Sequence, residues 1–133
     1  LAALNNVTPN RFSRIAIVDD SPDARRLIRR ILQSQGDFEI VEASNGNEAI
    51  ELVSRERPDI VILDLMMPEV DGFAVLDALR SKPETTNIPI IVATAKELTV
   101  SEKSRLQGQI QALMQKGDFL NDDFLDEVRS LIQ

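Results

Sequence analysis

Acidic residues stand directly after two apolar segments of the chain. The segment "IAIVDD" ends in Asp19 and Asp20. In "IVILDLMMP" four apolar residues run straight into Asp64. A carboxylate can attack phosphorus and form an aspartyl phosphate, and carboxylate oxygens are also ligands for hard cations such as Mg²⁺. The three aspartates are therefore the first candidates for chemistry.

Groups suited to binding phosphate follow two later apolar segments. Thr94 stands at the end of "IPIIVAT" and can offer a hydroxyl donor. Ala95 comes next and is small enough to admit a phosphoryl group. Lys116 ends "IQALMQK", where its ammonium can act as a point charge for phosphate. Phosphoryl transfer depends mainly on positioning and charge neutralisation, which these groups can supply.

The elements that must position these residues alternate along the chain. Apolar, β-branched segments predict strands over 14–18, 38–43, 59–64, 88–95 and 110–116. Capping residues and apolar residues at helical spacing predict a helix after each strand, with starts at Ser21, Asn45, Asp71-Gly72, Thr99 and Asn121. Glu48 is expected to complete a capping box with Asn45, and Leu27 to lie on the apolar face of the first helix. The helix after Thr99 has little beyond Val100 and Leu106 to bury. Alternating strands and helices are typical of an α/β fold with helices on both faces of a parallel sheet.

A doubly wound, flavodoxin-like (βα)₅ sheet with strand order 2-1-3-4-5 is the expected topology. In that order the first and third strands are neighbours, at the point where the winding reverses. Ligands bind there, outside the carboxyl ends of the strands. We therefore expect Asp20 and Asp64 to share one crevice although they lie far apart in the sequence.

Three carboxylates in one crevice require a counter-charge. Two like charges about 4 Å apart repel by about 4 kcal/mol at an effective dielectric of about 20, so a proton or a cation must relieve them. The chain has no histidine and no cysteine, and oxygen-only ligation suits Mg²⁺. The sequence predicts a Mg²⁺ site with room for phosphate. Asp64 is the candidate nucleophile because it lies centrally, between the other acids and the fourth strand.

Composition narrows the class of protein. The 133 residues fit one domain, and the net charge of −7 argues against a nucleic-acid surface. Without cysteine or histidine, thiol chemistry and the usual Ser-His and Cys-His nucleophiles are excluded. No apolar run approaches the roughly 20 residues of a membrane span, and no signal peptide is visible. We expect a cytoplasmic domain over 14–133 without membrane contact, preceded by a leader or linker over 1–13.

Each candidate residue also has an ordinary structural explanation. Acid pairs in loops are often solvated or lie at helix N-termini, and a threonine in a strand usually reflects β propensity. A lysine after a strand is usually a surface residue. Met66 and Met67 are most simply packing or turn residues. The functional interpretation depends on their conjunction, because all the candidates follow strands that end at one edge of one sheet.

With these residues in place, the chain resembles the receiver domain of two-component response regulators over about 14–133. The motifs that carry the resemblance are "VDDSPDARRLI", "DIVILDLMMPEVDGFAVLDALR", "IPIIVATAKE" and "LMQKGDF". The resemblance implies a phosphoacceptor that takes its phosphoryl group from a histidine kinase or a histidine phosphotransfer domain. It assigns these roles: Asp64 as acceptor, Asp19 and Asp20 as Mg²⁺ ligands, the Met66 backbone carbonyl as a further ligand, Thr94 as switch hydroxyl and Lys116 as phosphate-binding lysine. Signalling would proceed through a shift in the face formed by the fourth strand and the fifth helix.

Two positions depart from the family pattern. The family usually has an aromatic residue where this chain has Leu113, and a proline where it has Gly117. We expect the phosphorylation chemistry to survive both changes, which bear on the usual output switch instead. The segment 98–119 resembles receivers attached to the C-terminal end of hybrid sensor histidine kinases. A domain of that kind acts in a phosphorelay or tunes its own kinase.

Two other functions remain as alternatives. A receiver-like interaction module that no longer takes phosphate is disfavoured by the complete set of acids, threonine and lysine. A Mg²⁺-dependent phosphatase with an aspartate nucleophile usually carries Asp-x-Asp after its first strand, whereas Asp19 and Asp20 are adjacent. A flavin-binding flavodoxin is also disfavoured, because the chain has no Trp or Tyr to stack on the flavin.

Overall fold

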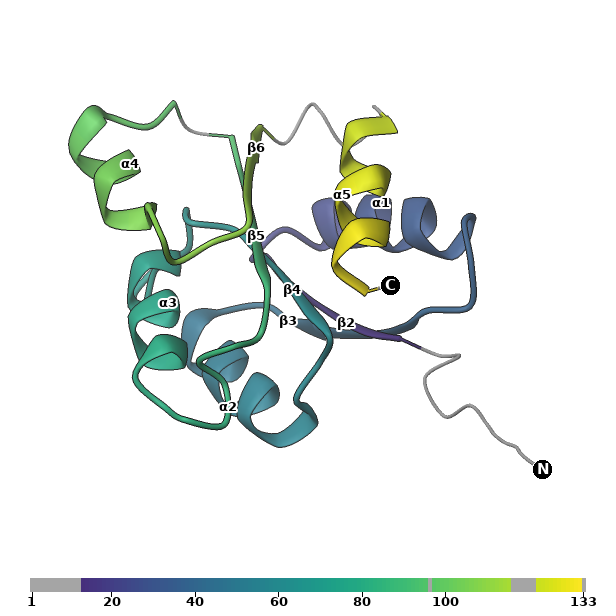
Figure 1. The fold of residues 1–133 in the computed structure, drawn as a ribbon, viewed down its shortest axis with the longest axis horizontal. Coiled ribbons are helices and arrows are strands. Elements are labelled where there is room, and N and C mark those ends of the chain that lie inside the picture. Colours follow the sequence, from purple (N-terminus) through teal and green to yellow (C-terminus); the bar gives the residue numbers. More distant parts are fainter. Residues whose placement is uncertain (1–12, 96, 116–121, 133) are drawn as a thin grey trace.

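The structure is a computed structural model that describes residues 13–95, 97–115 and 122–132 (Figure 1). Its strands are β2 (Arg14–Val18), β3 (Glu39–Ala43), β4 (Ile60–Leu63), β5 (Ile90–Thr94) and β6 (Ala112–Gln115). Its helices are α1 (Pro22–Gln33), α2 (Gly46–Glu56), α3 (Gly72–Arg80), α4 (Val100–Leu106) and α5 (Asp122–Ile132). None of the described helices combines the length and the hydropathy that a membrane span needs.

The strands form one parallel sheet in the order β3-β2-β4-β5-β6. This is the predicted order 2-1-3-4-5, counted along the five described strands. The winding reverses between β2 and β4, which are neighbours in the sheet. Val18, at the end of β2, lies opposite Leu63, at the end of β4. The two strands therefore finish at the same level.

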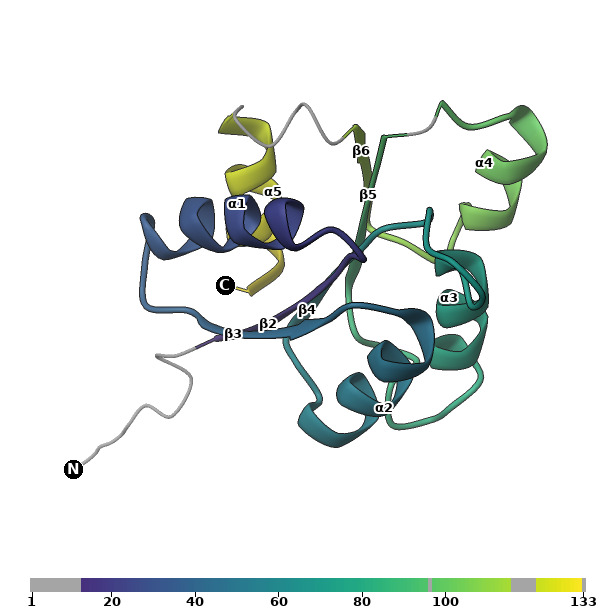
Figure 2. The ribbon, with the colours of Figure 1, turned by 180° about the vertical axis from the view of Figure 1, so that it is seen from behind.

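Helices cover both faces of the sheet (Figures 1 and 2). Ile15 and Ile17 of β2 pack on the side of α1 and α5, whereas Ala16 and Val18 pack on the side of α2, α3 and α4. All four side chains are buried. From Ile15 to Val18 the strand is buried on both faces, which is why this part of its sequence is a continuous apolar run.

The predicted helix caps are present in the structure. The Ser21 hydroxyl accepts a hydrogen bond from the Ala24 N–H at 3.2 Å, and the Asp71 carboxylate accepts one from the Ala74 N–H at 3.0 Å. Thr99 and Glu102 form the reciprocal capping box. Each of these bonds satisfies a backbone donor of the first helical turn that has no partner within the helix.

Two local expectations of the sequence reading were wrong in detail. Glu48 was expected to bond back to the cap residue Asn45, but its carboxylate accepts from the Ser44 N–H at 2.7 Å. Leu27 was expected on the apolar face of α1 but is 40% exposed, because the buried stripe follows Ile28 and Leu32. The predicted cap Asn121 lies outside the described residues.

The helix α4 has little apolar surface in the core, as its sequence predicted. Leu106 is its buried residue, whereas Val100 is 83% exposed. The Arg105 guanidinium lies 4.3 Å from the centre of the Phe73 ring and 3.5 Å from a carboxylate oxygen of Asp77. These contacts to α3 involve an exposed charge and contribute on the order of 1 kcal/mol.

Arg80, the last residue of α3, binds the two loops that precede strands β5 and β6. Its guanidinium donates to the carbonyl oxygens of Thr86 and Ile88 at 2.9 Å, and to that of Gln109 at 2.6 Å. Burial lowers the pKa of Arg80, and no carboxylate pairs with it among the described residues. The charge is held entirely by backbone carbonyls.

We predict that Arg80→Ala lowers the free energy of unfolding by about 2 kcal/mol, because it leaves partly buried carbonyls without donors. Urea denaturation measures this difference. Arg55→Ala is the matched control, since Arg55 is an exposed residue of α2 that pairs with its neighbour Glu56; its effect should stay within about 0.5 kcal/mol. Equal decreases in the free energy of unfolding for the two variants would show that the hydrogen bonds of Arg80 do not stabilise the fold.

Candidate functional site

The structure brings the three predicted aspartates together. One carboxylate oxygen from each of Asp19, Asp20 and Asp64 lies within 4.8 Å of the others. Asp19 and Asp64 are both 2% exposed, whereas Asp20 faces solvent. The cluster therefore has a buried floor made of two carboxylates and an open side at the third.

The strand ends fix the backbone of both buried aspartates. The Asp19 N–H donates to the carbonyl oxygen of Ala43 at 3.1 Å, and the Asp64 N–H donates to that of Val18 at 2.9 Å. These bonds extend the parallel ladders by one residue beyond β2 and β4. The hydrogen bonding of the sheet thus fixes the backbone positions from which the two side chains extend.

A backbone N–H two residues further on orients each buried carboxylate. Asp19 accepts from the Ser21 N–H at 2.9 Å, and Asp64 accepts from the Met66 N–H at 3.1 Å. Such short turns are a common use of aspartate. They hold one oxygen of each carboxylate in place.

Arg25 is a positioning residue that the sequence reading missed. Its guanidinium donates to the backbone carbonyl of Asp19 at 2.6 Å and to the Glu42 carboxylate at 2.9 Å. It therefore ties the loop after β2 to both α1 and β3. The only sequence signal is its place one turn into the helix that follows the acids.

Gly72 is the second residue whose role was missed. A Cβ atom at this position would lie 2.5 Å from the Asp64 carbonyl oxygen and 2.6 Å from the Leu65 Cα atom. The Gly72 N–H also donates to the Leu65 carbonyl at 3.2 Å. The first residue of α3 thus packs directly on the backbone that carries Asp64. The sequence marked this glycine only as a helix start.

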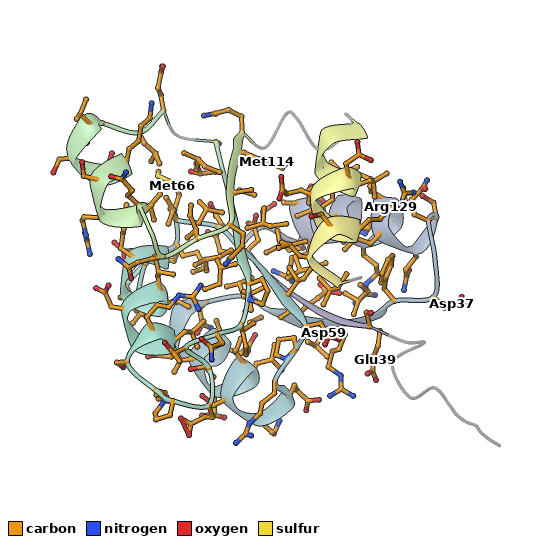
Figure 3. The ribbon with its side chains drawn as sticks, in the orientation of Figure 1. Asp37, Glu39, Asp59, Met66, Met114 and Arg129 are labelled. Atoms are coloured by element: carbon orange, nitrogen blue, oxygen red, sulfur yellow. The ribbon has the colours of Figure 1, made fainter. Side chains whose placement is uncertain are left out.

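The remaining predicted site residues are placed by the structure as far as it describes them. Thr94 ends β5 and is fully buried, and Ala95 after it is exposed. Met66 is 53% exposed. Figure 3 shows Met66 and Asp59, which stand after and before β4, at opposite ends of the sheet. Lys116 and Gly117 lie outside the described residues.

The acid cluster has the chemistry of a Mg²⁺ site. Like charges within 4.8 Å of one another repel by about 3 kcal/mol per pair at an effective dielectric of about 20. The donors are all carboxylate oxygens, which suit a hard cation of small radius. Since one ligand is exposed, a cation bound here would keep open positions. The residues present therefore fit Mg²⁺.

The chain belongs to the family of response regulator receiver domains, whose model matches residues 15–125. The family consists of signalling domains of two-component systems. In response regulators these domains interact with histidine kinases.

Three relatives place the chain within this family. It is 35% identical over 120 residues to the response regulator MprA of Mycobacterium leprae, covering 90% of this chain and 51% of that protein. It is 36% identical over 86 residues to protein PilH of Pseudomonas aeruginosa, covering 65% of this chain and 70% of that protein. A solved receiver domain of a signal transduction histidine kinase from Syntrophus aciditrophicus is 31% identical, with a TM-score of 0.78, over 90% of this chain and 89% of that one. The chain spans about half the length of MprA.

We predict that Gly72→Ala disturbs the Asp64 loop, because the added methyl group overlaps the backbone of Asp64 and Leu65. The loss of stability should be about 1–3 kcal/mol in urea denaturation. Chemical shifts of the Asp64 and Leu65 amides should change by more than those of the distant strand β3. The matched control is Gly36→Ala, where the nearest atom is a Phe38 ring carbon at 3.4 Å. Unchanged shifts at Asp64 would contradict the proposed packing role.

Proposed function

We propose that Asp64 accepts a phosphoryl group from the phosphohistidine of a histidine kinase or a histidine phosphotransfer domain. The observation that carries the proposal is the position of the Asp64 carboxylate, buried at the end of β4 and within 4.8 Å of Asp19 and Asp20. A donor that forms its phosphohistidine from ATP would place this reaction in the cytoplasm.

The transfer exchanges one bond for another at phosphorus. An oxygen of Asp64 attacks the phosphorus, and the bond from phosphorus to the histidine nitrogen breaks. The electron pair returns to the imidazole, which takes up a proton, and Asp64 becomes a mixed anhydride. Hydrolysis of that anhydride by water regenerates the carboxylate and releases inorganic phosphate. In this proposal the chain modifies itself and turns over no other substrate.

The other site residues receive roles around that step. Asp19, Asp20 and Asp64, with the backbone carbonyl of Met66, would hold Mg²⁺. The ion supplies charge neutralisation to an otherwise repulsive set of anions. The Thr94 hydroxyl and the Lys116 ammonium would donate to phosphoryl oxygens, and the small side chain of Ala95 leaves them room.

A conformational response follows from the same groups. Phosphorylation adds negative charge at Asp64, and we propose that Thr94 moves to bond it. The loop between β5 and α4 would follow Thr94. The weak attachment of α4, through Leu106 and the exposed Arg105, makes this helix the element that can shift at least cost.

The parent protein has two proposed architectures. The sequence similarity to MprA supports a response regulator. The sequence similarity to the receiver domain of a histidine kinase, together with the segment 98–119, supports the C-terminal receiver of a hybrid kinase. The full open reading frame distinguishes them. The Mg²⁺-dependent phosphatase is the weaker alternative function, because its Asp-x-Asp motif is absent from the acid pair.

We predict that Asp64→Asn abolishes labelling by acetyl phosphate in the presence of Mg²⁺, because the amide is a poor nucleophile. Intact-protein mass spectrometry detects the added phosphoryl group. Asp37→Asn is the matched control, since Asp37 is an exposed loop residue far from the cluster, labelled in Figure 3; it should label like the wild type. Wild-type labelling of the Asp64 variant would refute the acceptor assignment. Absence of labelling in the wild type would instead favour the interaction module.

We predict that Asp20→Ala weakens Mg²⁺ binding at least about tenfold, because it removes the exposed member of the cluster. Isothermal titration calorimetry suits this measurement, since the chain has no Trp to report binding. Stability without metal should be unchanged or slightly higher, as one repulsive charge is lost. Asp23→Ala serves as control: Asp23 is an exposed residue of α1 outside the cluster. Equal affinities for the two variants would argue against the metal site.

A further inference from the structure

The loop that carries Met66 joins β4 to α3 and is closed at its base. The Gly72 N–H donates to the Leu65 carbonyl at 3.2 Å, so one backbone hydrogen bond joins the two ends of residues 66–71. At the start of the loop the Met66 N–H donates to the Asp64 carboxylate at 3.1 Å. Leu65 and Met67 are buried on either side of Met66. The conformation of this β4–α3 loop therefore determines where the Met66 backbone carbonyl lies.

The outer part of the same loop has a strained backbone. Glu69 is exposed and has a φ of 67°, a conformation that residues other than glycine rarely adopt. Val70, the next residue, is half-buried and packs against the core on the side of α2 and α3. Pro68 has a fixed φ and restricts the backbone of Met67 before it. Few torsions are free between Met66 and Val70, so a displacement of Val70 is transmitted to Met66.

The first residue of α2, Gly46, lies directly against this outer part. A Cβ atom on Gly46 would be 2.3 Å from the Val70 carbonyl oxygen and 2.5 Å from the Val70 Cγ1 atom. Carbon atoms that are not bonded to each other have their optimal separation at about 3.5–4.0 Å. The backbone of α2 thus approaches the loop more closely than any residue with a side chain would allow.

The helix is held more firmly than the loop at this contact. Ala49 and Val53 of α2 are fully buried in the core, and Leu52 is 8% exposed. The start of the helix is fixed by its cap, because the Asn45 side chain accepts from the Glu48 N–H at 2.8 Å. The loop, in contrast, contains the exposed and strained residue Glu69. A side chain at position 46 would therefore displace the loop rather than the helix.

We propose that Gly46 is a positioning residue of the metal site. Because it has no side chain, α2 can hold the β4–α3 loop, through Val70, in the conformation in which Met66 offers its backbone carbonyl to Mg²⁺. The inference rests on the proposed function, in which that carbonyl is a ligand. It adds a helix that contributes no ligand to the set of elements on which the affinity for the ion depends.

The variant Gly46→Ala tests this role. Without Mg²⁺, the amide chemical shifts of Met66 and Val70 should change, because the loop has moved. Isothermal titration calorimetry should give Mg²⁺ binding that is about tenfold weaker than in the wild type. Labelling by acetyl phosphate should be slower at low Mg²⁺ and should recover at saturating Mg²⁺, since Asp64 itself is unaltered. Circular dichroism melting identifies the temperature range in which each variant is folded.

Gly108→Ala is the matched control for a loss of stability alone. Gly108 has a φ of 81°, so alanine is strained there, but no described atom lies within 4 Å of the added Cβ. This variant should melt at a lower temperature than the wild type and bind Mg²⁺ with unchanged affinity. A difference in affinity between the two alanine variants therefore reports the position of the loop and not the stability of the fold.

A second pair of variants loosens the loop without touching α2. Glu69→Gly removes the backbone strain and lets the loop leave its conformation, whereas Glu69→Gln removes the same charge and keeps the strain. We expect Glu69→Gly to bind Mg²⁺ more weakly than Glu69→Gln although its melting temperature is no lower. This pair decides the question if Gly46→Ala does not fold.

Four results would overturn the inference. The first is an unchanged Met66 amide shift in folded Gly46→Ala, and the second is equal Mg²⁺ affinity of Gly46→Ala and Gly108→Ala. The third is a labelling defect that saturating Mg²⁺ does not restore, which would indicate a general distortion of the site. The fourth is equal affinity of the two Glu69 variants. A wild type that binds no Mg²⁺ would overturn the proposed metal site together with this inference, whereas normal binding by both the wild type and Gly46→Ala would overturn the inference alone.

Discussion

The parallel register between β2 and β4 is the constraint on which the rest of the structure depends. Val18 lies opposite Leu63, so the residues that follow, Asp19 and Asp64, leave the sheet at the same level. A register shift of one residue would turn the side chains of one strand to the opposite face. The continuous burial of both strands prevents such a shift, because each strand packs against helices on its two sides.

This arrangement gathers negative charge where the fold would otherwise avoid it. Two buried carboxylates and one exposed carboxylate lie within 4.8 Å of one another. The backbone N–H groups of Ser21 and Met66 offset part of the repulsion, and Arg25 holds the loop that carries Asp19. The remaining repulsion is what makes a divalent cation a natural ligand. The repulsion among the three carboxylates thus both destabilises the site and favours the binding of the cation on which its proposed chemistry depends.

The surroundings of the cluster differ in how firmly they are held. Gly72 packs α3 against the backbone of Asp64, and Arg80 fastens the far end of the same helix. By contrast, α4 contributes one buried side chain, Leu106, and its exposed Arg105 contacts the Phe73 ring of α3. A change of charge at Asp64 would therefore be resisted by α3 and could be followed by α4.

The sequence alone determined the elements, their order in the sheet and the aspartates at its switch point. Apolar runs and capping residues are local signals, and the winding rules for parallel sheets then leave few topologies. Tertiary structure decided what depends on distant atoms. The contact of Gly72 with the Asp64 carbonyl, the bond from Arg25 to Asp19 and the exposure of Leu27 all arise from packing between separate segments. A glycine or an arginine in a helix looks the same in the sequence whether it faces solvent or a backbone carbonyl, because its neighbours in space are not its neighbours in the chain.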